Sequence, residues 1–116
     1  MARILSVSYD ESLLKTRELI LEERRHQVVS ALGFDEALKQ CHSNGNFDLL
    51  VLGHSIPHAH KELLIAEFRS HCSAPVVALK RYGEQPVRGA DFHIEPKPEH
   101  LLQVVAQLAL PNQSSA

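Results

Sequence analysis

Apolar and polar residues alternate along the chain in blocks that predict five strands separated by helical segments. The expected strands are the short apolar stretches "RILSVS", "QVVSAL", "FDLLVLG", "APVVALK" and "GADFHIE". The third of these is apolar on both faces, which is typical of a strand covered by helices on both sides of a sheet. Asp10 is placed to cap a first helix that runs to about Arg25. The other predicted helices are "GFDEALKQCHSNG", starting near Asp35 and ending at Asn44–Gly45, then "HKELLIAEFRSHC" and "EHLLQVVAQLAL".

This alternation predicts an α/β fold built from right-handed βαβ units around a mostly parallel sheet. Five strands in 116 residues indicate a doubly wound, flavodoxin-like sheet with strand order 2-1-3-4-5. We expect one domain over residues 1–110, followed by a flexible polar tail, "PNQSSA", over residues 111–116.

The connection between the fourth and fifth strands is too short for a full helix. It consists of "RYGEQPVRGA", with Pro86 in its middle, and therefore predicts that the fourth helix is shortened or missing. The apolar face left open needs a cover. The candidates are Val87, Tyr82 and part of the last helix, or a second chain.

Composition excludes several classes of protein. A formal net charge of -2 argues against nucleic-acid binding, which calls for clustered Lys and Arg. The N-terminus "MARILSVS" is unlike a signal peptide, and no apolar run approaches the roughly 20 residues that span a bilayer. Cys41 and Cys72 both fall in predicted helices, in no paired motif, as expected of free thiols in a reducing compartment. We therefore expect a cytoplasmic protein without a membrane or nucleic-acid partner.

Five stretches, in order, are similar to motifs of the receiver domain of bacterial two-component response regulators. They are "RILSVSYDESLLKTRELILEE", "VVSALGFDEALKQC", "FDLLVLGHSIP", "APVVALKRYG" and "GADFHIEP", which together cover about Arg3 to Leu108. The resemblance implies the receiver fold and phosphorelay signalling. It also implies an Asp that accepts a phosphoryl group, an acidic pair that holds Mg²⁺, a Ser or Thr, and a Lys.

The residues that carry this chemistry are replaced at every one of those positions. Gly53 stands at the position of the accepting Asp, Ser8 and Tyr9 at the acidic pair, Lys80 at the Ser/Thr, and Glu95 at the Lys. Asp10, one residue beyond the pair, offers a single carboxylate, which is a poor Mg²⁺ site. The sequence predicts a pseudo-receiver that lacks the phosphoacceptor Asp and needs no cofactor.

Two details of this degenerate phosphorylation pocket stay open. In "EPKP", either Glu95-Pro96 or Lys97-Pro98 can match the Lys-Pro of the family. We prefer Glu95-Pro96. In that register Lys80 and Glu95 end neighbouring strands. They either form an ion pair that fills the old phosphate pocket or remain two solvated charges.

His54, His58 and His60 share one turn, but their spacing matches no strong zinc signature. We interpret the turn as an exposed polar loop and predict no metal site. A catalytic Ser8–His54 pair would lack an oxyanion hole and an orienting acid, so we do not expect an enzyme.

The resulting functional hypothesis is a signalling module that is not phosphorylated at the usual site and acts through protein–protein interaction. The expected partner is a sensor kinase or another regulator, and a homodimer is a further option. The alternative is a sensor that binds a small anion or a nucleotide at the C-terminal ends of the strands. The candidate ligand or partner contacts are His54, His58, Arg81 and Lys97.

Overall fold

The computed structural model describes residues 2–43 and 46–108, and it confirms the predicted parallel sheet of order β2-β1-β3-β4-β5. The strands are β1 Arg3–Ser8, β2 Gln27–Leu32, β3 Leu49–Leu52, β4 Val76–Leu79 and β5 Phe92–Ile94. The helices are α1 Glu11–Glu23, α2 Phe34–His42, α3 His58–Arg69 and α4 Pro98–Leu108. Asn44–Gly45, the predicted end of the second helix, and the predicted tail 111–116 lie outside the described residues.

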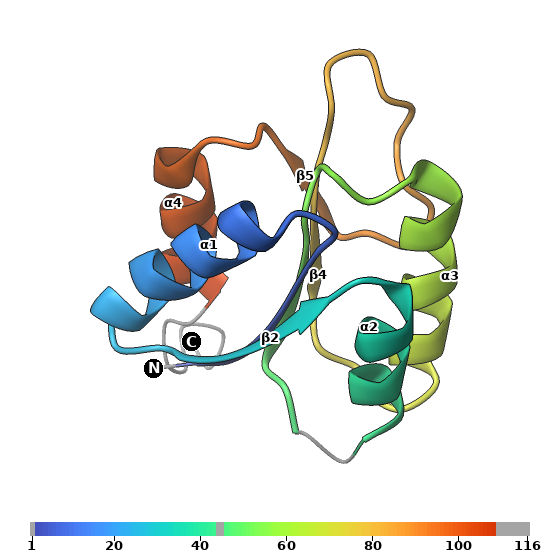
Figure 1. Ribbon diagram of the computed structural model, residues 1–116, viewed down its shortest axis with the longest axis horizontal. Coiled ribbons are helices and arrows are strands. Elements are labelled where there is room, and N and C mark those ends of the chain that lie inside the picture. Colours follow the sequence, from blue (N-terminus) through green and yellow to red (C-terminus); the bar gives the residue numbers. More distant parts are fainter. Residues whose placement is uncertain (1, 44–45, 109–116) are drawn as a thin grey trace, which may run out of the picture.

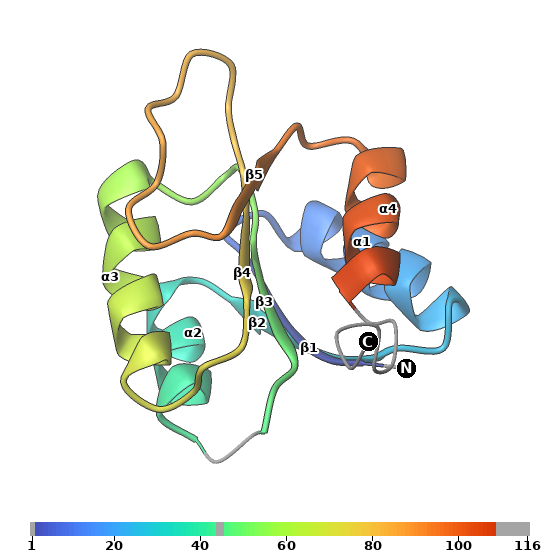
Figure 2. The same ribbon diagram turned by 180° about the vertical axis from the view of Figure 1, so that it is seen from behind.

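The helices form two layers on opposite faces of the sheet. α1 and α4 cover one face, and α2 and α3 cover the other (Figure 1, Figure 2). The central strands β3 and β4 are buried along their whole length, which explains why they are apolar on both faces. Among the described residues, no helix combines the length and apolar character that crossing a bilayer requires.

The helix starts follow local capping signals only in part. Asp10 caps α1 as predicted, because its carboxylate accepts the Leu13 N–H at 3.0 Å. The next helix begins at Phe34, one residue before the predicted Asp35, and α3 begins at His58, two residues earlier than expected. Because α3 ends at Arg69, Cys72 lies beyond the helix that was predicted to contain it.

Between β4 and β5 the chain forms a long loop without a helix, residues 80–91, which stands out from the body of the molecule (Figure 1). Val87 from this loop is 2% exposed and packs into the core beside Ile65 and Phe68, so it covers the open face as predicted. The same prediction for Tyr82 is wrong, because its side chain is fully exposed.

Polar contacts from α3 hold this loop against the helix. Lys61 is 0% exposed, and its Nζ donates to the Glu84 carboxylate at 2.8 and 3.0 Å and to the Leu79 carbonyl at 2.8 Å. Farther along, the Arg88 N–H donates to Glu62 at 2.9 Å. Gly89, with φ +92°, lies so close to Ile65 that a Cβ there would stand 2.8 Å from its Cγ2.

The charges of the Lys61–Glu84 pair depend on each other. Burial acts to raise the pKa of Glu84, but the hydrogen bonds from Lys61, the Arg81 N–H and His58 outweigh it and lower that pKa to about 2. Burial lowers the pKa of Lys61, and Glu84 opposes the change. The loop that replaces the missing helix thus supplies the counter-charge for a fully buried lysine.

Candidate functional site

The predicted site residues lie at the C-terminal edge of the sheet, where parallel strands present their ends together. Ser8 is the last residue of β1, Gly53 follows β3, Lys80 follows β4 and Glu95 follows β5. The Gly53 N–H donates to the Val7 carbonyl at 2.9 Å, which places Gly53 beside the end of β1.

Hydroxyl groups occupy the place where the resemblance puts an acidic pair. The hydroxyls of Ser8 and Ser55 lie 3.1 Å apart. The Asp10 N–H donates to the Ser8 hydroxyl, and the Tyr9 N–H donates to the Ser55 hydroxyl, each at 3.0 Å. The Ser8 hydroxyl is therefore engaged with Ser55 and Asp10.

These residues do not fit a Mg²⁺ ion. The Asp10 carboxylate, one residue beyond the expected pair, accepts the Leu13 N–H and so caps α1. Mg²⁺ is held in proteins by oxygen ligands that usually include carboxylates. Among the residues that the structure describes, no three His, Cys, Asp or Glu side chains are grouped to hold a metal.

The Tyr9 side chain points toward the helix layer formed by α2 and α3. Its hydroxyl lies 2.8 Å from His60 Nδ1, and the His60 ring also packs on Phe34 with ring centroids 4.8 Å apart. Burial and the neighbouring Asp35 raise the pKa of Tyr9, so the phenol stays neutral. Tyr9 is therefore a packing residue that links β1 to α3.

An arginine occupies the space above Gly53. A Cβ built on Gly53 would lie 3.1 Å from Arg17 Nη1, 3.4 Å from Nη2 and 3.1 Å from the Val7 carbonyl oxygen. Arg17 comes from α1 and is only 6% exposed. A side chain at position 53 would meet this guanidinium at once, so the cation stands where a phosphoacceptor Asp would project.

The burial of Arg17 has a signal in the sequence. Leu14, Arg17 and Leu21 follow one another at helical spacing, and all three are buried. The spacing alone thus places Arg17 on the buried side of α1, between two leucines.

His54 lies next to this arginine. Burial lowers the pKa of His54, and the positive charges of Arg17, Lys61 and Arg81 lower it further, against an opposing effect from Asp10. Its Nδ1 is buried and has no hydrogen-bond partner among the described residues. The imidazole is therefore neutral at pH 7, in a field of positive charge.

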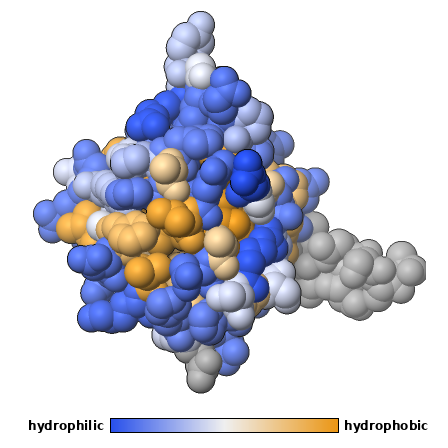
Figure 3. All heavy atoms as spheres, turned by 90° about the vertical axis from the view of Figure 1, so that its right-hand side faces the viewer, coloured by the Kyte–Doolittle hydropathy of each residue, from blue (hydrophilic) through white to orange (hydrophobic). Residues whose placement is uncertain are grey.

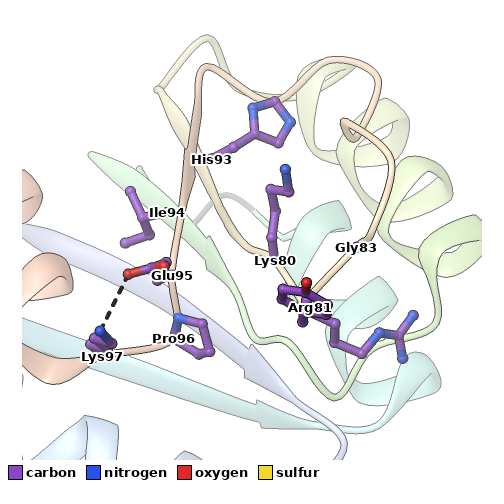
Figure 4. Close-up of a pocket in the computed structure, with 9 residues that line it drawn as sticks. Lys80, Arg81, Gly83, His93, Ile94, Glu95, Pro96 and Lys97 are labelled. Atoms are coloured by element: carbon purple, nitrogen blue, oxygen red, sulfur yellow. Dashed lines mark ion pairs between the residues drawn. The ribbon is translucent and has the colours of Figure 1, made fainter.

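Of the two alternatives for Lys80 and Glu95, an ion pair or two separate charges, the structure shows no ion pair. The two side chains point away from each other, and Glu95 turns toward Lys97 (Figure 4). Glu95 pairs with Lys97 at 3.5 Å and with His100 at 3.6 Å, because both follow it within five residues while Lys80 comes from another strand. The backbone joins the two strand ends, where the Lys80 N–H donates to the Ile94 carbonyl at 2.9 Å.

The remaining candidate contacts are dispersed. His58 is held by Glu84 at 2.9 Å and Glu62 at 3.2 Å, so His54, His58 and His60 do not converge. Arg81 and Lys97 border an open groove of about 530 Å³ beside β5 (Figure 4). The groove is also lined by Lys80, Tyr82, Gly83, His93, Ile94, Glu95 and Pro96.

Comparison with solved structures identifies the architecture. The response regulator protein TrrA from Thermotoga maritima, in complex with Mg²⁺ and BeF, is 24% identical, with a TM-score of 0.79 over 93% of this chain and 99% of that one. The receiver domain of hybrid histidine kinase CckA is also 24% identical, with a TM-score of 0.77 and the same coverage. A structure of histidine kinase ThkA in complex with TrrA matches at 25% identity, with a TM-score of 0.77 over 95% and 100% of the two chains.

The sequence matches no protein-family model and no curated protein. The structural neighbours are nevertheless response-regulator receiver domains, and they establish that this chain has the receiver fold over nearly its whole length.

Proposed function

We propose that the protein is a pseudo-receiver: a non-enzymatic, response-regulator-like signalling module that is not phosphorylated at the usual site and acts by binding another protein. One observation carries the first half of the proposal. The position of the phosphoacceptor is Gly53, and the Arg17 guanidinium lies against it. The receiver fold of the structural neighbours supports the signalling role.

Phosphoryl transfer needs a nucleophile and positive charge placed around the transferred group. Gly53 supplies no nucleophile, and hydroxyls fill the region in which Mg²⁺ ligands would stand. Restoring the nucleophile alone does not restore the chemistry. In Gly53→Asp, the new carboxylate would meet Arg17 and form an ion pair with it, still without a Mg²⁺ site.

A phosphodonor experiment tests this half. The protein and its Gly53→Asp variant are incubated with acetyl phosphate and Mg²⁺ and measured by intact mass spectrometry, beside an active receiver domain as the positive control. We expect neither to gain a phosphoryl group. A stoichiometric, acid-labile phosphoryl adduct on the unaltered protein would overturn the proposal.

The second half concerns the outer face of α3, which carries the best candidate surface for a protein partner. Apolar side chains gather on the side of the molecule where α3 lies (Figure 3). Leu63 is 54% exposed there, and it borders a shallow hollow with Ala59, Ala66 and Gly89. Glu62 and Arg88 lie at the same hollow, so charged side chains accompany the apolar centre, as at protein interfaces.

The proposed partner is a sensor kinase or another regulator. A neighbour of the same fold, TrrA, is found in complex with a histidine kinase. Two leucines offer a matched test, because Leu63 on α3 and Leu19 on α1 are about equally exposed, at 54% and 57%, on helices that cover opposite faces of the sheet. We expect Leu63→Asp, but not Leu19→Asp, to abolish cross-linking to a histidine kinase or response regulator in the source cell.

A homodimer is the competing occupant of this face. Sedimentation equilibrium distinguishes the two: a monomer supports a different partner, whereas a dimer lost in Leu63→Asp assigns the face to self-association.

We place the module in the cytoplasm as a single domain over residues 1–110. Cys41 and Cys72 are free, as befits a reducing compartment, and burial raises the pKa of Cys41 to about 11.

The groove beside β5 supports the second candidate, a sensor for an anion or nucleotide at the strand ends. Lys80, Arg81 and Lys97 border it, but so does Glu95, which already pairs with Lys97. We therefore prefer the interaction module. Nucleotide-dependent protection of the fold against heat, lost in Arg81→Met, would favour the sensor instead.

A further inference from the structure

A small cavity lies between α1 and α4, under the end of β3. Its volume is about 150 Å³, roughly that of five water molecules at about 30 Å³ each. Most of its wall is apolar, from Leu13, Ile20, Leu79 and Leu101. The cationic residues in its lining are Arg17 and Lys97, and the neutral His54 also lines it.

Arg17 is a buried cation for which the described chain provides no counter-charge. It is 6% exposed, and its Nη1 is buried without any hydrogen-bond partner. No carboxylate among the described residues forms an ion pair with it. Guanidinium groups stay charged in proteins, and an isolated buried charge is strongly unfavourable, so an anion is the expected complement.

His54 adds a second unsatisfied group at the same cavity. Its Nδ1 is buried without a partner and can donate a proton to an oxygen if the tautomer allows it. Asp10 is the acid whose charge reaches His54, and its carboxylate is used to cap α1. Two residues with unpaired nitrogen atoms, Arg17 and His54, and the cationic Lys97 therefore line one small space.

We propose that this cavity binds a small oxyanion of the phosphate or carboxylate class, held by the Arg17 guanidinium and the His54 ring, with Lys97 at its mouth. The Lys97 side chain is 60% exposed and pairs with Glu95 at 3.5 Å, so it lies at the solvent side of the site. The cavity is too small for a nucleotide base and sugar in addition to the oxyanion. This inference goes beyond the proposed partner binding and does not depend on it.

The oxyanion would be bound non-covalently, and it would complete the electrostatics of the degenerate pocket. Arg17 lies against Gly53, where a phosphoacceptor Asp would bring a negative charge. A free anion in the cavity supplies the charge that the described chain does not bring to Arg17. Occupancy would then fix α1 against α4, the two helices that border the cavity.

Thermal unfolding tests the proposal with defined anions. The melting temperature of the full chain is measured in chloride, phosphate, sulfate and acetate at one ionic strength and pH. The comparison includes Arg17→Met and the control Arg24→Met, an exposed arginine one residue beyond the same helix. We expect phosphate to raise the melting temperature of the unaltered protein and of Arg24→Met by several degrees relative to chloride, and to leave Arg17→Met unchanged.

The anion series also identifies the source of the oxyanion. A gain with phosphate and sulfate but not acetate assigns a phosphoryl-like ligand, whereas a gain with acetate alone assigns a carboxylate. The proposal is overturned if the oxyanions act no differently from chloride, or if they act equally on Arg17→Met. Because Arg17→Met could alter folding, NMR of the unaltered protein provides a second reading: phosphate must shift the His54 ring resonances in a saturable manner, ahead of those of exposed His71.

Discussion

Lys61 and Arg17 are both buried cations on helices, one on each face of the sheet, and the chain treats them differently. Lys61 is 0% exposed, and its Nζ donates to Glu84 and to the Leu79 carbonyl. Arg17 is 6% exposed, and its Nη1 donates to nothing in the described chain. One cation is complemented within the fold, and the other is not.

The difference follows from the groups that pack against each cation. On the face of α3, the helix expected between β4 and β5 is replaced by a loop, and that loop carries Glu84 to Lys61. On the face of α1, no carboxylate of the described chain pairs with Arg17, and Gly53, against which the guanidinium lies, has no side chain. A buried ion pair with satisfied hydrogen bonds is structural, whereas a buried charge without a partner indicates a missing ligand.

Removing the lysine should produce the largest effect. Lys61→Met leaves Glu84 buried without its main partner, and breaking such a pair destabilises a protein by about 3–5 kcal/mol. Urea denaturation measures the loss. The control is Lys39→Met, whose ion pair with Glu36 spans 3.7 Å on the surface and is worth at most about 1 kcal/mol. If both variants lose the same small amount, Glu84 does not anchor the loop.

Acid should reproduce part of this loss. The pKa of Glu84 falls from 4.5 to about 2 on folding, so its stabilisation is complete above about pH 5 and disappears as the pH falls toward 2. The full shift corresponds to about 3 kcal/mol, and solvent screening beside the loop reduces the expected contribution to about 2 kcal/mol. The free energy of unfolding, measured from pH 6 to pH 2, should therefore decline less steeply in Glu84→Gln. An equal decline in both proteins would assign the acid sensitivity to other carboxyl groups.

The sequence predicted the receiver fold because strands, helices and turns are encoded by local patterns, such as the double-sided apolar run of β3. It also placed Gly53 and Ser8 at one edge of the sheet. It could not place Glu84, since nothing near "RYGEQP" indicates that its acid will reach a lysine 23 residues earlier on α3. For the same reason the sequence left open whether Lys80 and Glu95 pair, because strand order brings backbones together but does not determine where long side chains point.

Removing the arginine should have the opposite sign from removing the lysine. In buffer free of oxyanions, Arg17→Met replaces an unpaired buried charge by an apolar side chain, so we expect the free energy of unfolding to rise by about 1–2 kcal/mol. The exposed control Arg24→Met should stay within about 0.5 kcal/mol of the unaltered protein. Saturating phosphate should reduce the advantage of Arg17→Met. A loss comparable to that of Lys61→Met would instead show that Arg17 is already complemented.

The smallest expected effect comes from adding one methyl group at position 53. A Cβ in Gly53→Ala would stand 3.1 Å from both Arg17 Nη1 and the Val7 carbonyl oxygen. Both neighbours must yield slightly, and such overpacking should destabilise the protein by about 1 kcal/mol. A double-mutant cycle with Arg17→Met separates the two contacts, because the variant removes only the guanidinium. If Arg17 is the main obstacle, the cost in the Arg17→Met background falls by about 0.5 kcal/mol or more. If the cost is unchanged, the Val7 carbonyl limits the space, and the guanidinium only borders position 53.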